Sequence, residues 1–377
     1  MLKKIYINNF RCLQNFDISF EELDTALILG GNGSGKSNFF AAVELFQKIG
    51  LGTVNLKDLI TKEDFAFGDT SKPMTLELQV ELEKQAYQYR LEIDWPEHFR
   101  QPKVRQETLK VDGKTMLNRD EGKTQLNQYG SQAAEFTLDW HHIGLPLIST
   151  RNEQEPIALL RTWLASILVL SPVPSLFEAV SKGEELYLRK NADNLLDWLR
   201  YMLAESPASY KDISEFIQER MTDFDLFKFD ATGKDEKELL VRFRSAASKS
   251  SLELNFSQLS DGEKIYFLTA TVLAAIDNDI PRLCLWDEPD NFVSLPELSQ
   301  FIAACRKRFT ASKKGSQLIV TSHNSRVINS FSGHNTYFLS RKTHFHPSRV
   351  ELLSEKTYLS PTLIEAYENG ELEDGSE

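Results

Sequence analysis

Cysteine is scarce in this sequence, and long apolar runs are absent. The chain of 377 residues holds only three cysteines, which form neither a CxxC pair nor a disulfide framework (Cys12, Cys284 and Cys305). We interpret all three as small buried or half-buried apolar residues without a chemical role. No apolar run approaches the ~20 residues that a membrane helix needs, and no signal-peptide core follows the first residues. We therefore expect a cytoplasmic protein that does not contact membranes.

Positive charge is in deficit, and sequence repeats are missing. The formal net charge of −12 argues against a surface coated with basic residues for non-specific binding to nucleic acid. The basic residues within 306–314 fit a solvated helix end at least as well as a local basic patch. No heptad pattern persists for three or four repeats, which excludes a long coiled-coil arm. With 41% hydrophobic and 26% charged residues, the composition is that of an ordinary globular protein.

The most informative stretch is 30–37, which reads GGNGSGKS. It follows an apolar run at 26–29 and precedes apolar residues at helical spacing, which is the context of a phosphate-binding P-loop. Glycines leave backbone N–H groups free to converge on phosphate oxygens, and the helix N-terminus favours negative charge. The alternative, a chance turn rich in glycine, is disfavoured because every fixed position of the motif is filled. The predicted nucleotide-binding residues are Gly30, Asn32, Gly33, Gly35, Lys36 and Ser37.

Within this motif, two side chains have separate predicted roles. Lys36 is expected to reach the β- and γ-phosphates of a nucleoside triphosphate, and the Ser37 hydroxyl is expected to hold Mg²⁺. Around the motif, alternation of apolar and polar residues predicts further elements. We expect strands at 3–9, 16–20, 75–82, 86–93, 107–111, 135–140 and 239–243, a loop at 114–134, and helices within 191–222.

Two further apolar strands are predicted to end in polar side chains. LCLWDEP at 283–289 places Asp287 and Glu288 at a strand end, where the first carboxylate can serve Mg²⁺ and the second can polarise a water molecule. A surface turn after a core strand is the alternative. LIVTSHN at 318–324 places His323 at a similar strand end, where it is expected to sense the γ-phosphate rather than to be structural.

SQLSDGEK at 257–264 is ambiguous on its own. Ser260 and Glu263 have the spacing of a helix capping box, so the stretch can be read simply as the start of a helix. Four other histidines have no matching partners and are interpreted as surface or strand residues rather than metal ligands (His141, His142, His344 and His346).

In this order, the motifs resemble the ATP-binding-cassette (ABC) class of ATPases. More narrowly, they resemble soluble heads of the SMC/RecF/OLD-like group, AAA family ATPases of the type found in bacterial anti-phage defence. The opening INNFRCLQNFDISF adds to this resemblance, which covers about 1–60 and 235–345. It implies an α/β fold, a P-loop NTPase of the ABC-type head with an N-terminal β-rich part and a helical insertion. The expected segments are 1–71 with the P-loop, 72–234 as a β-rich then helical insertion, and 235–377 with the remaining motifs.

The resemblance also implies roles for individual residues. Lys36 and Ser37 match the P-loop, Asp287 the Mg²⁺ position, Glu288 the catalytic base and His323 the switch histidine. Ser260 and Gly262 match the signature motif, which in this class caps the γ-phosphate of the opposite protomer. ATP and Mg²⁺ are the implied cofactors, and a homodimer or higher oligomer is implied when ATP is bound. Asp261 and the stretch 294–296 depart from the usual pattern.

Three functions remain open at this stage. The first is an ATPase that senses invasion in bacterial defence and controls a separate effector, a nuclease or a toxin. It is favoured because no paired acidic cluster of a nuclease follows His323. The second is a RecF-like repair ATPase that clamps DNA when ATP drives its dimerisation, although the acidic charge disfavours it. The third is a scaffold in which ATP is only a structural ligand.

Overall fold

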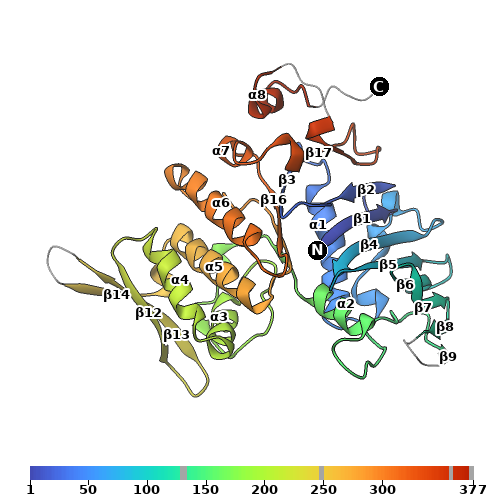
Figure 1. Cartoon of the computed structure of the whole chain (residues 1–377), viewed down its shortest axis with the longest axis horizontal. Helices are drawn as coiled ribbons and strands as arrows, with labels where there is room; N and C mark the ends of the chain where they lie inside the picture. Colours follow the sequence, from blue (N-terminus) through green and yellow to red (C-terminus); the bar gives the residue numbers. More distant parts are fainter. Residues whose placement is uncertain (128–133, 246–249, 356–359, 373–377) are drawn as a thin grey trace. The chain divides into compact units, whose positions relative to one another are not determined.

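The computed structural model describes residues 1–127, 134–245, 250–355 and 360–372. The chain divides into two compact units, the first made of 1–167 with 331–377 and the second of 168–330. Each unit is described by itself below (Figure 1). Within the described ranges, none of the helices combines the length and the apolar character needed to span a bilayer.

The first unit contains an antiparallel sheet of eight strands in the order β2-β1-β4-β5-β6-β7-β8-β9. Figure 1 shows strands β4 to β7 lying side by side in sequence order. The strands are β1 (Leu2–Asn8), β2 (Phe16–Ser19), β4 (Met74–Leu82), β5 (Gln85–Asp94), β6 (Lys103–Val111), β7 (Lys114–Asp120), β8 (Lys123–Leu126) and β9 (Ala134–Thr137).

A second group of strands in this unit carries the P-loop. Strand β3 (Thr25–Leu29) is buried throughout, and β17 (Thr336–Ser340) pairs with it in parallel, while β18 (Arg349–Leu352) pairs with β17 in antiparallel fashion. The helices of the unit are α1 (Lys36–Gly50), α2 (Pro156–Ala165) and α8 (Leu363–Glu368). Short 3-10 turns lie at Leu56–Asp58, Lys62–Asp64, Ala66–Gly68, Gly333–Asn335 and Leu353–Glu355.

Helix α1 forms the centre of this unit's core because its apolar residues recur at helical spacing. Phe39 and Phe46 are both completely buried. The Phe39 ring lies 5.7 Å from that of Phe16 on β2, and the Phe46 ring lies 6.4 Å from that of Tyr89 on β5. These contacts fix the N-terminus of α1, where the P-loop ends, against the eight-stranded sheet.

A buried ion pair joins β6 and β7. Glu107 and Arg119 are both 0% exposed, with Arg119 Nη1 3.5 Å from Glu107 Oε2. Both carboxylate oxygens of Glu107 also accept hydrogen bonds from backbone N–H groups, those of Gly144 and Leu145. The Arg119 guanidinium donates to three backbone carbonyls (Glu121, Asp139 and His142). Burial raises the pKa of Tyr89, whose hydroxyl donates to Glu107. Each charge is therefore saturated with partners, as buried charges require.

The second unit contains two groups of strands. In the first group, β10 (Ile167–Leu170), which starts at the unit boundary, lies beside β15 (Leu283–Trp286), and β15 pairs in parallel with β16 (Gln317–Thr321). In the second, β13 (Lys237–Arg244) pairs with β11 (Val180–Ser181), β12 (Phe224–Ala231) and β14 (Ser251–Asn255). The helices are α3 (Leu195–Glu205), α4 (Ser209–Gln218), α5 (Asp261–Ala275), α6 (Leu295–Thr310) and α7 (Ser325–Ile328), with 3-10 turns at Pro174–Leu176, Phe256–Gln258 and Ile276–Asn278.

Most predicted elements are confirmed, and one prediction is wrong. The strands next to the motifs and the helices within 191–222 are present. The predicted loop at 114–134 instead contains β7 and β8, and its last part, 128–133, lies outside the described residues. Strands β12 and β14 were not foreseen. The segment division at 71 and 234 stays a prediction.

Candidate functional site

The P-loop adopts a backbone that only glycine tolerates well at several positions. Gly30, Gly33 and Gly35 have φ values of +153°, +80° and +113°. A Cβ atom at Gly30 would lie 2.3 Å from the carbonyl oxygen of Leu339, and one at Gly35 would lie 2.5 Å from Ser348 Oγ. Such distances are far inside van der Waals contact. The glycines therefore allow β17 and the chain after it to approach the loop closely.

The Lys36 side chain folds back into the loop that precedes it. Its ammonium donates to the carbonyls of Gly30 at 2.6 Å and Gly31 at 3.3 Å, and the residue is 8% exposed. Asn32 and Ser37 are exposed, and no acidic residue occupies the first turn of α1. The buried ammonium and the helix N-terminus both favour an anion here. The residues present thus fit the phosphates of a nucleotide.

A second layer of side chains supports the P-loop from within the first unit. Ser348 Oγ donates to the carbonyl of Ser34 at 2.5 Å and lies 3.1 Å from the thiol of Cys12. Asn38, in the first turn of α1, donates to the same thiol at 3.0 Å and accepts from Arg11 at 3.3 Å. Cys12 is buried, as predicted, and so are the other two cysteines. Sequence reasoning missed Ser348, because nothing near it in the chain marks it.

In the second unit, the two predicted carboxylates lie directly after β15. The N–H of Asp287 donates to Leu170 on the neighbouring strand at 2.7 Å. Thr321, at the end of β16, donates through Oγ1 to Asp287 Oδ1 at 2.6 Å and accepts the N–H of Glu288 at 3.0 Å. One hydroxyl that is completely buried therefore holds both acidic residues. Sequence reasoning did not single out Thr321.

Glu288 and His323 are brought close together by the same strand ends. Glu288 has a φ of +47°, uncommon for a residue with a side chain, and its Oε2 accepts from Asn291 at 2.8 Å. Its Oε1 lies 3.8 Å from His323 Nε2, and both side chains are 36% exposed. Burial raises the pKa of the neighbouring Asp290 carboxyl, the charge of Glu288 adds to the rise, and a hydrogen bond from Ser322 opposes it.

The residues matched to a signature motif have a local structural role as well. Ser260 is the N-cap of α5: its hydroxyl accepts the N–H of Glu263, and its own N–H donates to the Glu263 carboxylate at 2.7 Å. The capping box is therefore real. A Cβ atom at Gly262 would lie 2.9 Å from the carbonyl oxygen of Phe292, so glycine lets α5 approach the chain after the acidic strand. The unusual stretch 294–296 begins α6, with Ser294 as its N-cap.

We expect that replacing Thr321 with valine lowers the rate of ATP hydrolysis by about ten- to a hundredfold, because each hydrogen bond to a charged group contributes about 1.5–3 kcal/mol. Valine has nearly the same shape as threonine but lacks the hydroxyl, so the hydrogen bonds to Asp287 and to the Glu288 N–H are lost. Steady-state hydrolysis at saturating ATP, together with urea unfolding, measures the effect. Thr321→Ser keeps the hydroxyl and should retain most of the rate. A Thr321→Val protein with the wild-type rate would contradict this role.

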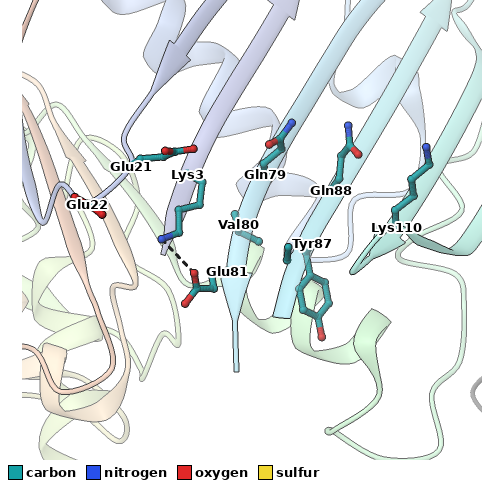
Figure 2. A pocket seen from close by; sticks show the side chains of 11 residues that line it. Lys3, Glu21, Glu22, Gln79, Val80, Glu81, Tyr87, Gln88 and Lys110 are labelled. Atoms are coloured by element: carbon teal, nitrogen blue, oxygen red, sulfur yellow. Dashed lines mark ion pairs between the residues drawn. The ribbon is translucent and has the colours of Figure 1, made fainter. Parts of the chain in front are cut away.

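A hollow of about 430 Å³ on the first unit is less suited to a triphosphate than the P-loop is (Figure 2). It is lined by Gln79, Gln88 and Lys110, from neighbouring strands, but also by the carboxylates of Glu21 and Glu22. Its other lysine is engaged in an ion pair with Glu81. The carboxylates that line this hollow would repel the negative charge of a triphosphate, whereas no acidic residue occupies the first turn of α1 at the P-loop.

The structure thus places the predicted residues in separate groups. The residues predicted to bind phosphate share one loop of the first unit, whereas Asp287, Glu288 and His323 share one pair of strand ends in the second. Ser260 and Gly262 lie at the start of α5, and Ser260 bonds to Glu263. The catalytic and binding roles of all these residues stay predictions.

Solved structures with a similar fold include heads of SMC proteins. One, the SmcHead bound to the C-winged helix domain of ScpA, matches with a TM-score of 0.57 and 15% identity, covering 97% of this chain and 99% of that one. Another is the Smc head domain with an extended coiled coil, bound to the C-terminal domain of ScpA, from Pyrococcus furiosus. It matches with a TM-score of 0.52 and 14% identity, covering 99% of each chain. At this identity the likeness shows the fold alone, that of an SMC head domain.

Comparison with curated proteins gives no match. One protein-family profile does match, over residues 26–329, and it carries the description "AAA domain, putative AbiEii toxin, Type IV TA system". The matched range holds the P-loop, the carboxylates that follow β15 and the strand end of His323, and it spans far more than half of the sequence. The chain therefore belongs to this AAA-domain family.

Proposed function

We propose that this protein binds ATP with Mg²⁺ and hydrolyses it slowly, and that nucleotide binding controls its assembly with itself and with a separate effector. The observation that carries the proposal is the P-loop. Three glycines with positive φ, the buried ammonium of Lys36 and the N-terminus of α1 form a cradle for phosphates. Gly30, Asn32, Gly33 and Gly35 would supply the backbone of this cradle.

Hydrolysis would use the groups after β15 and β16. Ser37 and Asp287 would hold Mg²⁺, which neutralises developing charge on the phosphates. Glu288 would act as the base for the attacking water, and His323 would sense the γ-phosphate. In support of this assignment, Glu288 Oε1 lies 3.8 Å from His323 Nε2, and a hydrogen bond from Asn291 orients the Glu288 carboxylate.

Assembly would involve the start of α5. Ser260 and Gly262 would cap the γ-phosphate bound by a second copy of the chain, so that ATP joins two protomers. Ser260 is exposed at the N-terminus of a 15-residue helix, a position that favours an anion. Asp261 beside it adds negative charge, which is consistent with weak capping and slow turnover.

The effector would be a separate protein, a nuclease or a toxin. The role of this chain would be in bacterial anti-phage defence. The family description, which names a toxin of a type IV toxin–antitoxin system, supports this context. The SMC head of similar fold is bound to a domain of another protein, ScpA, which supports a partner for this chain as well.

Mass measurement in solution tests the assembly step. We expect the mass to double, or to reach a higher multiple, when ATP and Mg²⁺ are added under conditions of little hydrolysis. ADP should leave the mass unchanged, because it lacks the γ-phosphate that the second copy would cap. If ATP binds and the mass stays that of one chain, the shared-site proposal is wrong. Co-purification with the product of a neighbouring gene would then test the effector role independently.

A further inference from the structure

The loop between β17 and β18, residues 341–348, adjoins the P-loop within the first unit. Strand β17 runs parallel to β3, with Phe338 opposite Leu29, so both strands end at the same edge. At the far end of the loop, the Ser348 hydroxyl donates to the carbonyl of Ser34, and its N–H donates to Cys12 at 2.9 Å. The loop is thus attached to the P-loop where it begins and where it ends.

The loop is also held in shape by its own hydrogen bonds. The Arg341 guanidinium donates to the carbonyls of His344 at 2.6 Å and His346 at 2.8 Å. Thr343 Oγ1 accepts the N–H of Phe345 at 3.2 Å and lies 2.8 Å from Nδ1 of His346. A loop that is fixed in advance loses little conformational entropy when a ligand binds.

The position of His344 is the feature that points to a ligand. Its Nε2 lies 4.0 Å from where a Cβ atom of Gly33 would be, and within that distance the described residues offer no other neighbour beyond the adjacent ones in the chain. Gly33 is exposed and belongs to the phosphate cradle. An anion held by the N–H groups of this cradle would therefore have the His344 imidazole as its neighbour.

The charge of the loop suits the same ligand. In a chain of net charge −12, residues 341–348 contain no Asp or Glu, and they hold two cations (Arg341 and Lys342) and two histidines (His344 and His346). A local positive field beside the P-loop attracts a polyanion such as a triphosphate. Lys342 and His344 are both exposed.

We propose that His344 is a binding residue of the nucleotide site and donates a hydrogen bond from Nε2 to a phosphate oxygen held by the P-loop. The loop 341–348 then forms a wall of the site contributed by the C-terminal part of the chain. This inference rests on the proposed function, because it presumes that the P-loop binds a nucleoside triphosphate. It adds a contact that the motif itself does not contain.

Titration of the full-length protein with Mg·ATP, followed by calorimetry, tests the contact. His344→Ala should raise the Kd for ATP by about tenfold, the change that corresponds to about 1.4 kcal/mol. His344→Gln keeps an N–H donor at a similar distance and should recover much of the affinity. Phe345→Ala is the matched control: Phe345 is the next residue, is 84% exposed and has no place in the proposed contact, so its removal should leave the Kd unchanged.

Each result has a distinct meaning. An unchanged Kd in His344→Ala overturns the proposal, and so does an equal loss in Phe345→Ala, which would indicate that loop packing matters rather than the imidazole. If the wild-type protein binds no ATP, the proposed function fails instead. Thermal melting of each variant checks that the fold is retained.

Discussion

Lys36→Ala is expected to lose ATP binding, with a Kd at least about a hundredfold weaker than that of the wild-type protein. The ammonium is the one cationic group that the structure places inside the P-loop among the described residues, where it contacts the carbonyls of Gly30 and Gly31. Two charge-assisted hydrogen bonds to phosphate contribute about 3 kcal/mol or more together, and every 1.4 kcal/mol corresponds to a factor of ten. Calorimetric titration with ATP measures the loss.

A matched control lies on the same helix. Lys48, in the last turn of α1, pairs with Glu44 at 2.9 Å, and its side chain is 44% exposed. Lys48→Ala removes the same charge from α1 but should leave the Kd for ATP unchanged, since an exposed pair of this kind contributes little. If Lys36→Ala binds ATP as the wild-type protein does and melts at the same temperature, the P-loop assignment is wrong.

The parts of the fold that could be predicted are those whose signal is local. Strand β3, the glycine-rich loop and α1 follow one another directly, and the apolar spacing of each is plain in the sequence. The capping box of Ser260 and Glu263 is equally local, since it depends on residues three apart. Such features do not require knowledge of which strands become neighbours.

The missed strand β7 shows how tertiary structure can override a local pattern. One of its buried positions is Arg119, a residue type that is almost never buried without partners. Its partner Glu107 is on β6, and its other acceptors are backbone carbonyls that no sequence pattern marks. Polar residues at 114–134 therefore indicated a loop, although β7 and β8 lie within 114–126.

Thr321 was not singled out, and the position of His344 beside Gly33 was not foreseen, for a different reason, which is strand register. Trp286 pairs with Val320, so Asp287 and Thr321 occupy the next positions on parallel strands and their side chains meet. His344 follows β17, which pairs with β3 from more than 300 residues away in the sequence. Pairings over such separations cannot be read from periodicity, so the carboxylates were predictable whereas the residues around them were not.

Glu288→Gln is expected to retain ATP binding while hydrolysis falls by about 10²- to 10⁴-fold, the usual contribution of a general base. The amide has the same size as the carboxylate and can still accept from Asn291 through its oxygen, so the local geometry should persist. It cannot accept a proton from the attacking water. Steady-state phosphate release measures the loss of hydrolysis.

The same variant should accumulate the ATP-bound oligomer, because the nucleotide that joins the protomers is no longer consumed. The comparison is with Asp277→Asn, the same change of charge at a carboxylate of the second unit that pairs with Arg308 and is 62% exposed. That control should hydrolyse ATP at the wild-type rate and disassemble as ATP is used up. An unchanged rate of hydrolysis in Glu288→Gln would show that Glu288 is not the catalytic base. ATP would then be a structural ligand of a scaffold if the biological activity were unchanged as well.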